Sequence, residues 1–332
     1  MRAHEPRFLT ASAPRAASAA QVRYDTQYQM TRVIKGLVVG TVVSVGLAAC
    51  GAPPAVTGSG TTLQVIAGEN FWGSIAAQLG GTHVSVTSIV TNPNADPHEY
   101  ESSTRDARAF ATANYVVLNG AGYDDWGAKL LSANPNQGRK VVTVADLLHK
   151  KAGDNPHFWY SPDYVEQVAD RITADYQALD SADSSYFNQR RAALRTALQP
   201  YHDLVAKIRS SFSGAPVGAT ESIFVYMAQA LGLNLVSPPE FMQAVAEGND
   251  PPAQTVAQFH DLLAGKKIKL LVYNVQASTN ITEDLKRLAA NNAIPVVGIS
   301  ETLQPVDATF QEWQDAQLLT LQNALNAQAL TH

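Results

Sequence analysis

The sequence predicts an α/β protein with two lobes, each built on a mostly parallel sheet that helices flank. Short apolar strands alternate with helical segments along most of the chain. A long helical stretch, residues 183–212, contains no glycine and separates two such series. Residues that can bind metals follow several strands directly or lie in proline-fixed loops. Because open α/β sheets bind ligands at the carboxyl ends of their strands, we expect a site in a cleft between the lobes.

Residues 62–182 are predicted to form the N-terminal lobe. The segment 115–120 is apolar on both faces, which is typical of a strand in a buried parallel sheet. Ser102 or Ser103 is a suitable cap for the helix that follows. The strands expected here are 62–68, 84–90, 115–120 and 140–144, and the helices are 70–79, 103–113 and 162–179.

The linking segment 183–213 and the C-terminal lobe, residues 214–332, complete the prediction. Apolar residues recur at three- and four-residue steps through 183–212, and Pro200 predicts a kink or a local break there. The strands expected in the second lobe are 216–220, 233–236, 269–273 and 294–299, and the helices are 223–231, 256–263, 282–291 and one from about 309.

The first fifty residues resemble an export signal. A short basic segment, 30–35, precedes an apolar stretch, 36–49, which is shorter than the ~20 residues of a membrane span. Leu47-Ala48-Ala49-Cys50 resembles a bacterial lipobox, so Cys50 is the predicted lipid-modified residue. We interpret 1–49 as an N-terminal extension and lipoprotein signal peptide, with Met30 a more plausible start than Met1, and 50–61 as a flexible tether.

Composition and charge narrow the class of protein. Hydrophobic residues make up 45% and charged residues 16% of the 332 residues, as in a globular protein. Residues 1–49 hold six basic and two acidic residues; without them 18 basic and 27 acidic residues remain, a net charge of −9. An acidic exported protein is a poor candidate for nucleic acid and a plausible one for cations. Cys50 is the only cysteine, so no intramolecular disulfide is expected.

Two histidines lie in matched local sequences, Asp96-Pro97-His98 and Asn155-Pro156-His157. Proline restricts its own φ and the residue before it, so each histidine is held in a stiff frame. Glu221 and Glu301 follow strands of the second lobe. We predict that these four side chains bind one divalent metal, and that two carboxylates neutralise it. Nitrogen and oxygen ligands without sulfur suit Zn²⁺, Mn²⁺ or Fe²⁺.

Three segments carry a resemblance to a known family: Asn92–Glu101, Asn155–Trp159 and Thr220–Leu233. From about residue 61 onward, the chain resembles the substrate-binding lipoproteins of bacterial zinc and manganese ABC transporters, which include the manganese-binding streptococcal adhesins. The resemblance implies two lobes bridged by one long helix with limited hinge motion. It also implies four metal ligands, a monomer, a location in the cell envelope, and an ABC permease with its ATPase as partners. Glu221 stands where zinc-type members have histidine and manganese-type members often have glutamate. Glu301 stands near the family's usual aspartate, which is a departure in residue type.

Other interpretations remain open at this point. Glu221 could be a helix N-terminal carboxylate and Glu301 a solvated loop residue, with Asp307 a weaker competitor for the fourth position. Trp159, Tyr273 and Asn274 are candidates to line the site or hydrogen-bond to its ligands. Four protein ligands leave little room for a reactive water, so we expect a binding protein and no enzyme. The alternatives are a metal-dependent hydrolase, in which a glutamate acts as general base, and an adhesin-type surface lipoprotein.

Overall fold

The computed structural model describes residues 62–329 as two α/β lobes joined by a long helix. The predicted signal peptide, Cys50 and the tether lie outside these residues. The N-terminal lobe contains strands β1 Leu63–Glu69, β2 Val84–Val90, β3 Tyr115–Leu118 and β4 Lys140–Thr143, and helices α1 Asn70–Gly80, α2 Thr104–Thr112, α3 Asp125–Ala133, α4 Val144–Leu147 and α5 Pro162–Leu179. The linking helix is α6 Ser184–Phe212.

The C-terminal lobe repeats this architecture with shorter strands. It contains strands β5 Pro216–Ala219, β6 Asn234–Leu235, β7 Leu271–Asn274 and β8 Val296–Ile299, and helices α7 Val225–Ala230, α8 Pro239–Ala246, α9 Ala253–Ala264, α10 Asn280–Asn291 and α11 Phe310–Ala329. The sheet orders are β2-β1-β3-β4 and β6-β5-β7-β8, and all strand pairs are parallel. The predicted fold class is therefore confirmed.

The register of the second sheet brings three strand ends together. Ala219 at the end of β5 pairs with Val272 of β7, and Asn274 at the end of β7 pairs with Ile299 of β8. Because the strands are parallel, the residues that follow β5 and β8 emerge at the same edge as Asn274. Glu221 and Glu301 follow those two strands, so the topology places both carboxylates beside Asn274.

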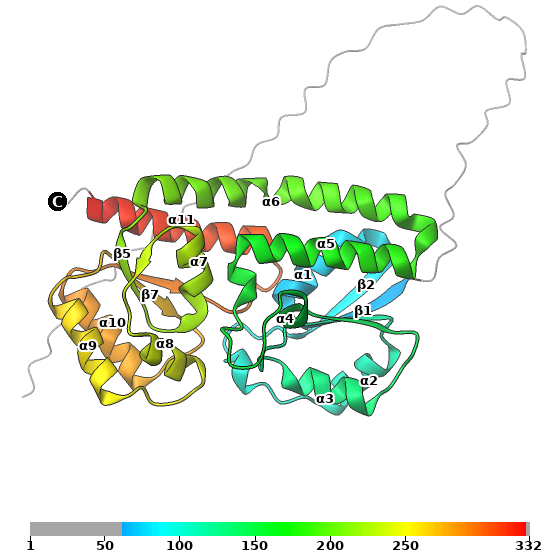
Figure 1. Ribbon diagram of the computed structural model, residues 1–332, viewed down its shortest axis with the longest axis horizontal. Coiled ribbons are helices and arrows are strands. Elements are labelled where there is room, and N and C mark those ends of the chain that lie inside the picture. Colours follow the sequence, from blue (N-terminus) through cyan, green and yellow to red (C-terminus); the bar gives the residue numbers. More distant parts are fainter. Residues whose placement is uncertain (1–61, 330–332) are drawn as a thin grey trace, which may run out of the picture. The chain divides into compact units, whose positions relative to one another are not determined.

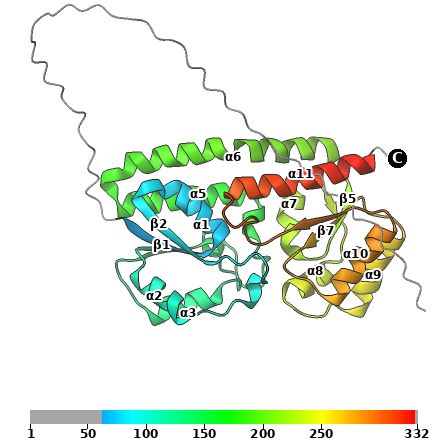
Figure 2. The same cartoon turned by 180° about the vertical axis from the view of Figure 1, so that it is seen from behind.

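Helices α5, α6 and α11 lie along one side of the two sheets (Figures 1 and 2). One continuous cluster of buried apolar residues includes members from both sheets, from α6 and from α11. On α6 these are Phe187, Leu194, Leu198, Tyr201 and Ile208. Separating the lobes would expose part of this apolar surface, which opposes large relative movements.

Helix α6 continues through Pro200, where the sequence predicts a kink or a local break, and no break is present. Pro200 is exposed, so water can bond the carbonyl that loses its helical partner. Leu198 and Tyr201, on either side, are fully buried and hold the helix against the core.

Three helices of the fold were absent from the sequence prediction: the short α4, and α3 and α8. Gly127 in the first turn weakens the helical pattern of α3, but a Cβ there would lie 2.7 Å from Leu118, so close packing favours glycine. Pro238 and Pro239 suggest a break, yet they occupy the cap and first turn of α8, where proline is favoured.

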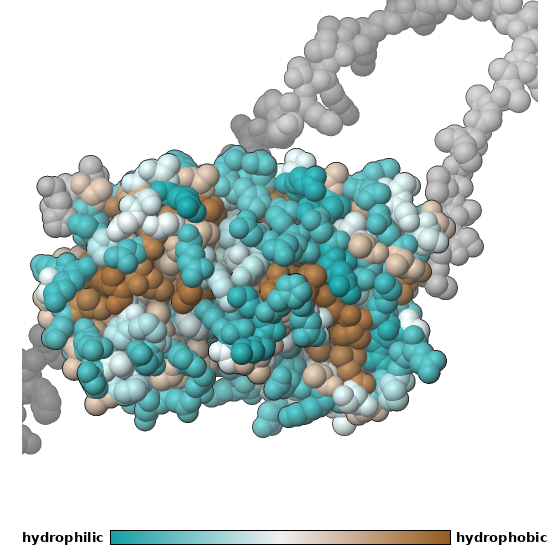
Figure 3. Space-filling model, viewed as in Figure 1, coloured by the Kyte–Doolittle hydropathy of each residue, from teal (hydrophilic) through white to brown (hydrophobic). Residues whose placement is uncertain are grey.

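Hydrophilic residues cover much of the face shown in Figure 3, with hydrophobic residues gathered in smaller patches. Among residues 62–329, no helix combines the length and apolar character needed to span a bilayer.

Candidate metal centre

His98 lies in the loop after β2, in a 3₁₀ turn formed by Pro97–Glu99. The Asp96 carboxylate accepts a hydrogen bond from the His98 backbone N–H at 2.9 Å, which closes an Asx turn around Pro97. From the other lobe, Gln276 Nε2 donates to the Ala95 carbonyl at 2.8 Å. The loop that carries His98 is therefore held from both lobes.

His157 directly precedes the 3₁₀ turn Phe158–Tyr160. Asn155 Oδ1 accepts from the His157 backbone N–H at 3.1 Å and lies 2.7 Å from His157 Nδ1. Because an amide oxygen can only accept, Nδ1 carries the proton in the neutral ring and Nε2 keeps its lone pair. The ring also packs edge-on against Trp159, at 5.2 Å between centroids. His157 therefore presents Nε2 to the interior as a fixed donor atom.

The four predicted side chains converge in the structure. One ligand atom from each of His98, His157, Glu221 and Glu301 lies within 4.8 Å of all the others. His157 Nε2 is 3.2 Å from Glu221 Oε1 and 3.8 Å from Glu301 Oε2, and His98 Nε2 is 3.4 Å from Glu301 Oε2. Ligands at ~2.0–2.1 Å from a tetrahedral Zn²⁺ lie about 3.3 Å apart, so the set has nearly the size of such a shell.

Three of these donor atoms are buried without a hydrogen-bond partner: His98 Nε2, His157 Nε2 and Glu221 Oε1. Buried polar atoms are almost always satisfied, because an unpaired one costs about 1–3 kcal/mol. Three such atoms facing one another are the arrangement expected of a site that binds a cation.

The charges of the site are coupled across the lobes. Burial opposes protonation of His98, but the charges of Glu301, Glu221 and Asp96 together outweigh it and raise the pKa of His98 to about 9. Burial also raises the pKa of Glu301, but His98 and then His157 lower it below its usual range. His98 is therefore protonated at neutral pH, and a metal ion bound at its Nε2 would have to displace that proton.

Asn274 and Tyr123 contact the two glutamates. Asn274 Nδ2 donates to Glu221 Oε2, and to Glu301 Oε1 at 2.8 Å. The Tyr123 hydroxyl donates to Glu301 Oε2 at 2.6 Å. Burial, and next the charge of Glu301, raise the pKa of Tyr123 well above its usual value, so the phenol keeps its proton.

Two further buried acids, Glu69 and Asp124, belong to the same lobe as Tyr123. Burial and then the charge of Asp124 raise the pKa of Glu69 well above its usual value. Burial likewise raises the pKa of Asp124 to about 6. The backbone N–H groups of Asn119 and Gly120 donate to Asp124 and lower this pKa, but by less than burial raises it. Glu69 is thus held in its neutral form, and neither of its carboxyl oxygens has a hydrogen-bond partner.

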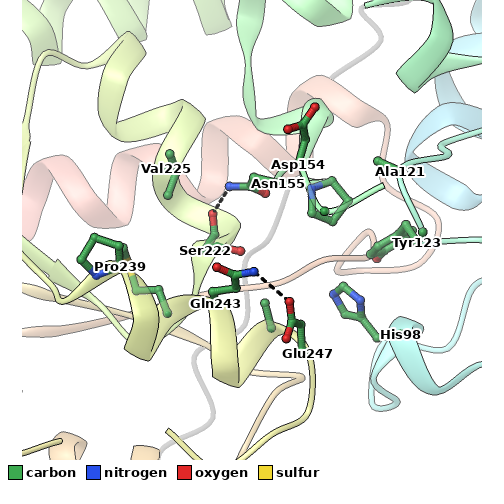
Figure 4. Close-up of a pocket in the computed structure, with 15 residues that line it drawn as sticks. His98, Ala121, Tyr123, Asp154, Asn155, Ser222, Val225, Pro239, Gln243 and Glu247 are labelled. Atoms are coloured by element: carbon green, nitrogen blue, oxygen red, sulfur yellow. Dashed lines mark hydrogen bonds between the residues drawn. The ribbon is translucent and has the colours of Figure 1, made fainter. Parts of the chain in front are cut away.

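A cavity of about 500 Å³ opens onto one side of the site (Figure 4). Of the four candidate ligands only His98 lines it, and the His98 side chain is 21% exposed whereas the other three are fully buried. Figure 4 shows His98, Tyr123, Gln243 and Glu247 among the residues that line the cavity, with Glu247 beside His98. Of the four side chains, only that of His98 can therefore be reached from the cavity.

Several residues that the sequence singled out behave differently. Asp307 is exposed and is not part of the cluster. Tyr273 does not face the site, because its hydroxyl donates to Glu283 at 2.7 Å. Tyr123 was not identified as a site residue from the sequence. Tyr123 follows the end of β3, just as the predicted ligands follow strand ends, and this position is the signal that could have identified it.

The fold is shared with solved metal-binding proteins of bacteria. The chain superposes on the crystal structure of ZnuA with a TM-score of 0.65 and 23% identity, covering 80% of this chain and 99% of that one. It superposes equally, with a TM-score of 0.65 and 19% identity, on the solute-binding protein FpvC from Pseudomonas aeruginosa in complex with Mn²⁺, covering 80% and 99% of the two chains.

The chain belongs to the ZnuA family, described as zinc-uptake complex component A, periplasmic, whose model matches residues 65–324. It is 25% identical over 236 residues to the manganese-binding lipoprotein MntA of Bacillus subtilis, which is 67% of this chain and 74% of MntA. It is 22% identical over 257 residues to the zinc-binding lipoprotein AdcA of Streptococcus pneumoniae, covering 71% of this chain and about half, 48%, of AdcA. The family membership confirms the resemblance inferred from the three sequence segments.

Proposed function

We propose that this protein captures one divalent transition metal, Zn²⁺ or Mn²⁺ with Fe²⁺ also within range, and delivers it to an ABC permease for import. The ligands are His98, His157, Glu221 and Glu301, two from each lobe. The observation that carries the proposal is the set of three buried donor atoms without hydrogen-bond partners, which converge with Glu301 Oε2. Membership of the ZnuA family and the names of the relatives support the same function.

The charge of the site favours a divalent cation. Once His98 has released its proton, two buried carboxylates and two neutral imidazoles give a net charge of −2, which one divalent ion balances. A monovalent ion would leave a buried charge, and an anion would meet two carboxylates.

The site is suited to binding and release, with no chemical step. Four protein ligands fill a tetrahedral shell, whereas catalytic zinc sites keep a position for water or substrate. We therefore propose that the protein is not an enzyme. It is exported, is anchored to the membrane through a lipid on Cys50, and acts as a monomer with a permease and its ATPase.

Metal analysis tests this function directly. Purified protein is stripped of metal, titrated with Zn²⁺ and Mn²⁺, and compared with His98→Ala and with the exposed control His260→Ala. We expect one equivalent of metal for the unsubstituted protein and the control, and loss of tight binding in His98→Ala. Unchanged binding in His98→Ala, or turnover of esters, peptides or phosphates by the metal-loaded protein, would contradict the proposal.

A further inference from the structure

We infer that Asn274 determines metal specificity, because its side-chain amide restricts both glutamates to one ligand oxygen each and thereby favours four-coordinate Zn²⁺ over Mn²⁺. This inference rests on the proposed function, since it concerns which metal the same site prefers. It follows from the hydrogen bonds around Asn274.

The orientation of the Asn274 amide is fixed by its neighbours. Asn274 Oδ1 accepts a hydrogen bond from the Gln276 backbone N–H at 3.0 Å. Since this side of the amide must be the acceptor, the two N–H groups of Nδ2 face the site. Asn274 is 1% exposed, so water cannot replace these bonds.

Each N–H of Asn274 occupies one carboxylate oxygen. Nδ2 donates to Glu221 Oε2 and to Glu301 Oε1. The oxygens left for a metal are Glu221 Oε1 and Glu301 Oε2, and these are the two that lie near the histidine Nε2 atoms. Glu301 Oε2 also accepts a hydrogen bond from Tyr123, which fixes the orientation of the carboxylate and leaves this oxygen a second lone pair for a metal.

A carboxylate that binds a metal through both oxygens must turn both of them toward the ion, which would rotate the oxygen that Asn274 holds away from its N–H. That rotation would leave a buried N–H without an acceptor, which is unfavourable. The protein therefore offers two nitrogens and two oxygens. Zn²⁺ accepts a tetrahedral set of four, whereas Mn²⁺ favours octahedral, oxygen-rich coordination. Glu221, Glu301 and His157 are fully buried, so added water ligands have access only from the His98 side.

The first test is the visible spectrum of the Co²⁺-loaded protein, because tetrahedral Co²⁺ absorbs far more strongly than six-coordinate Co²⁺. We expect strong tetrahedral bands for the unsubstituted protein. Weak, six-coordinate bands would overturn the inference even if metal binding is tight, and this readout does not require any variant to fold.

The second test compares Zn²⁺ and Mn²⁺ affinities, by competition with a chelator, for the unsubstituted protein, Asn274→Ala and Asn119→Ala. Asn119 is also a buried asparagine, but its amide bonds Trp72 and the Pro156 carbonyl and contacts neither glutamate. Substitutions next to metal ligands typically change affinity about 10–100-fold. We expect Asn274→Ala to lower the ratio of Zn²⁺ to Mn²⁺ affinity by about that factor and to weaken the Co²⁺ bands, while Asn119→Ala changes both affinities by the same factor.

The outcomes separate the inference from the function on which it rests. If the unsubstituted protein binds metal but Asn274→Ala leaves the affinity ratio and the Co²⁺ spectrum unchanged, Asn274 does not set specificity and the proposed function stands. If the unsubstituted protein binds neither Zn²⁺ nor Mn²⁺, both fail.

Discussion

Replacing Glu301 by glutamine tests how the site combines charge and coordination. The substitution keeps the shape of the side chain and removes its negative charge. Glu301 is the carboxylate that lies 3.4 Å from His98 Nε2 and that contributes most to raising the pKa of His98 to about 9. Glu301→Gln therefore removes a proposed ligand and also lowers the pKa of His98 in the metal-free site.

The expected loss of zinc affinity follows from the number of ligands in the site. Structural zinc sites with four ligands provide roughly 10–16 kcal/mol, so an equal share is roughly 2.5–4 kcal/mol per ligand. At about 1.4 kcal/mol for each factor of ten, zinc affinity should fall about 10²- to 10³-fold.

The pH dependence of zinc affinity gives a second, independent test of the role of Glu301. In the unsubstituted protein the pKa of His98 is about 9, so below that pH metal must displace its proton. Affinity should rise about tenfold per pH unit towards pH 9 and level off above it. Glu301→Gln removes the charge that contributes most to raising this pKa, so the levelling should occur at a lower pH.

Competition titrations with a zinc chelator at several pH values measure both effects. Glu101→Gln is the matched control, because Glu101 is exposed and lies in the same loop as His98. We expect the control to match the unsubstituted protein throughout. Zinc affinity in Glu301→Gln within threefold of the control, with the same pH profile, would refute the assignment of Glu301 as a ligand.

Three further predictions concern the surroundings of the site. Glu69 and Asp124 have raised pKa values, that of Asp124 being about 6, so their contribution to stability is present at low pH and is lost as pH rises through about 6. Glu69→Gln removes one of these two titrating groups, so the melting temperature of metal-free protein should change less between pH 4 and pH 7; a circular-dichroism profile identical to that of the unsubstituted protein would contradict a raised pKa of Glu69. Leu198→Ala, in the buried face of α6, should lower the free energy of unfolding in urea by about 2–5 kcal/mol and leave one equivalent of metal bound; a loss below 1 kcal/mol would mean that α6 contributes little to the core. Gln276 connects the lobes, because its amide bonds the Ala95 carbonyl and the Glu301 backbone N–H at 2.8 and 2.7 Å; Gln276→Ala should speed hydrogen exchange in residues 92–98, and equal rates would contradict this connection.

Much of the fold could be predicted because its signals are local. Strands that are apolar on both faces and alternate with helices indicate parallel sheets, and this class is confirmed. Helices α3 and α8 were missed because Gly127 and the Pro238-Pro239 pair read locally as interruptions. Their roles depend on packing against Leu118 and on cap position, which only the folded chain defines.

The candidate ligands were also locally encoded. Both histidines follow an Asx-Pro pair, whose fixed backbone is visible in the sequence, and Glu221 and Glu301 follow predicted strands. The contacts that orient them are not local. Asn274 was a candidate from its place at a strand end, but its contact with both glutamates depends on β7 lying between β5 and β8. Tyr123 reaches Glu301 across the lobes. Strand order and lobe packing cannot be deduced from the sequence near Asn274 or Tyr123.

X-ray absorption spectroscopy of the zinc-loaded protein tests the central claim most directly. The account predicts one equivalent of Zn²⁺ with two histidine nitrogens and two carboxylate oxygens at about 2.0–2.1 Å, and loss of one histidine contribution in His157→Ala. A shell made mainly of water oxygens, or one that His157→Ala leaves unchanged, would contradict it.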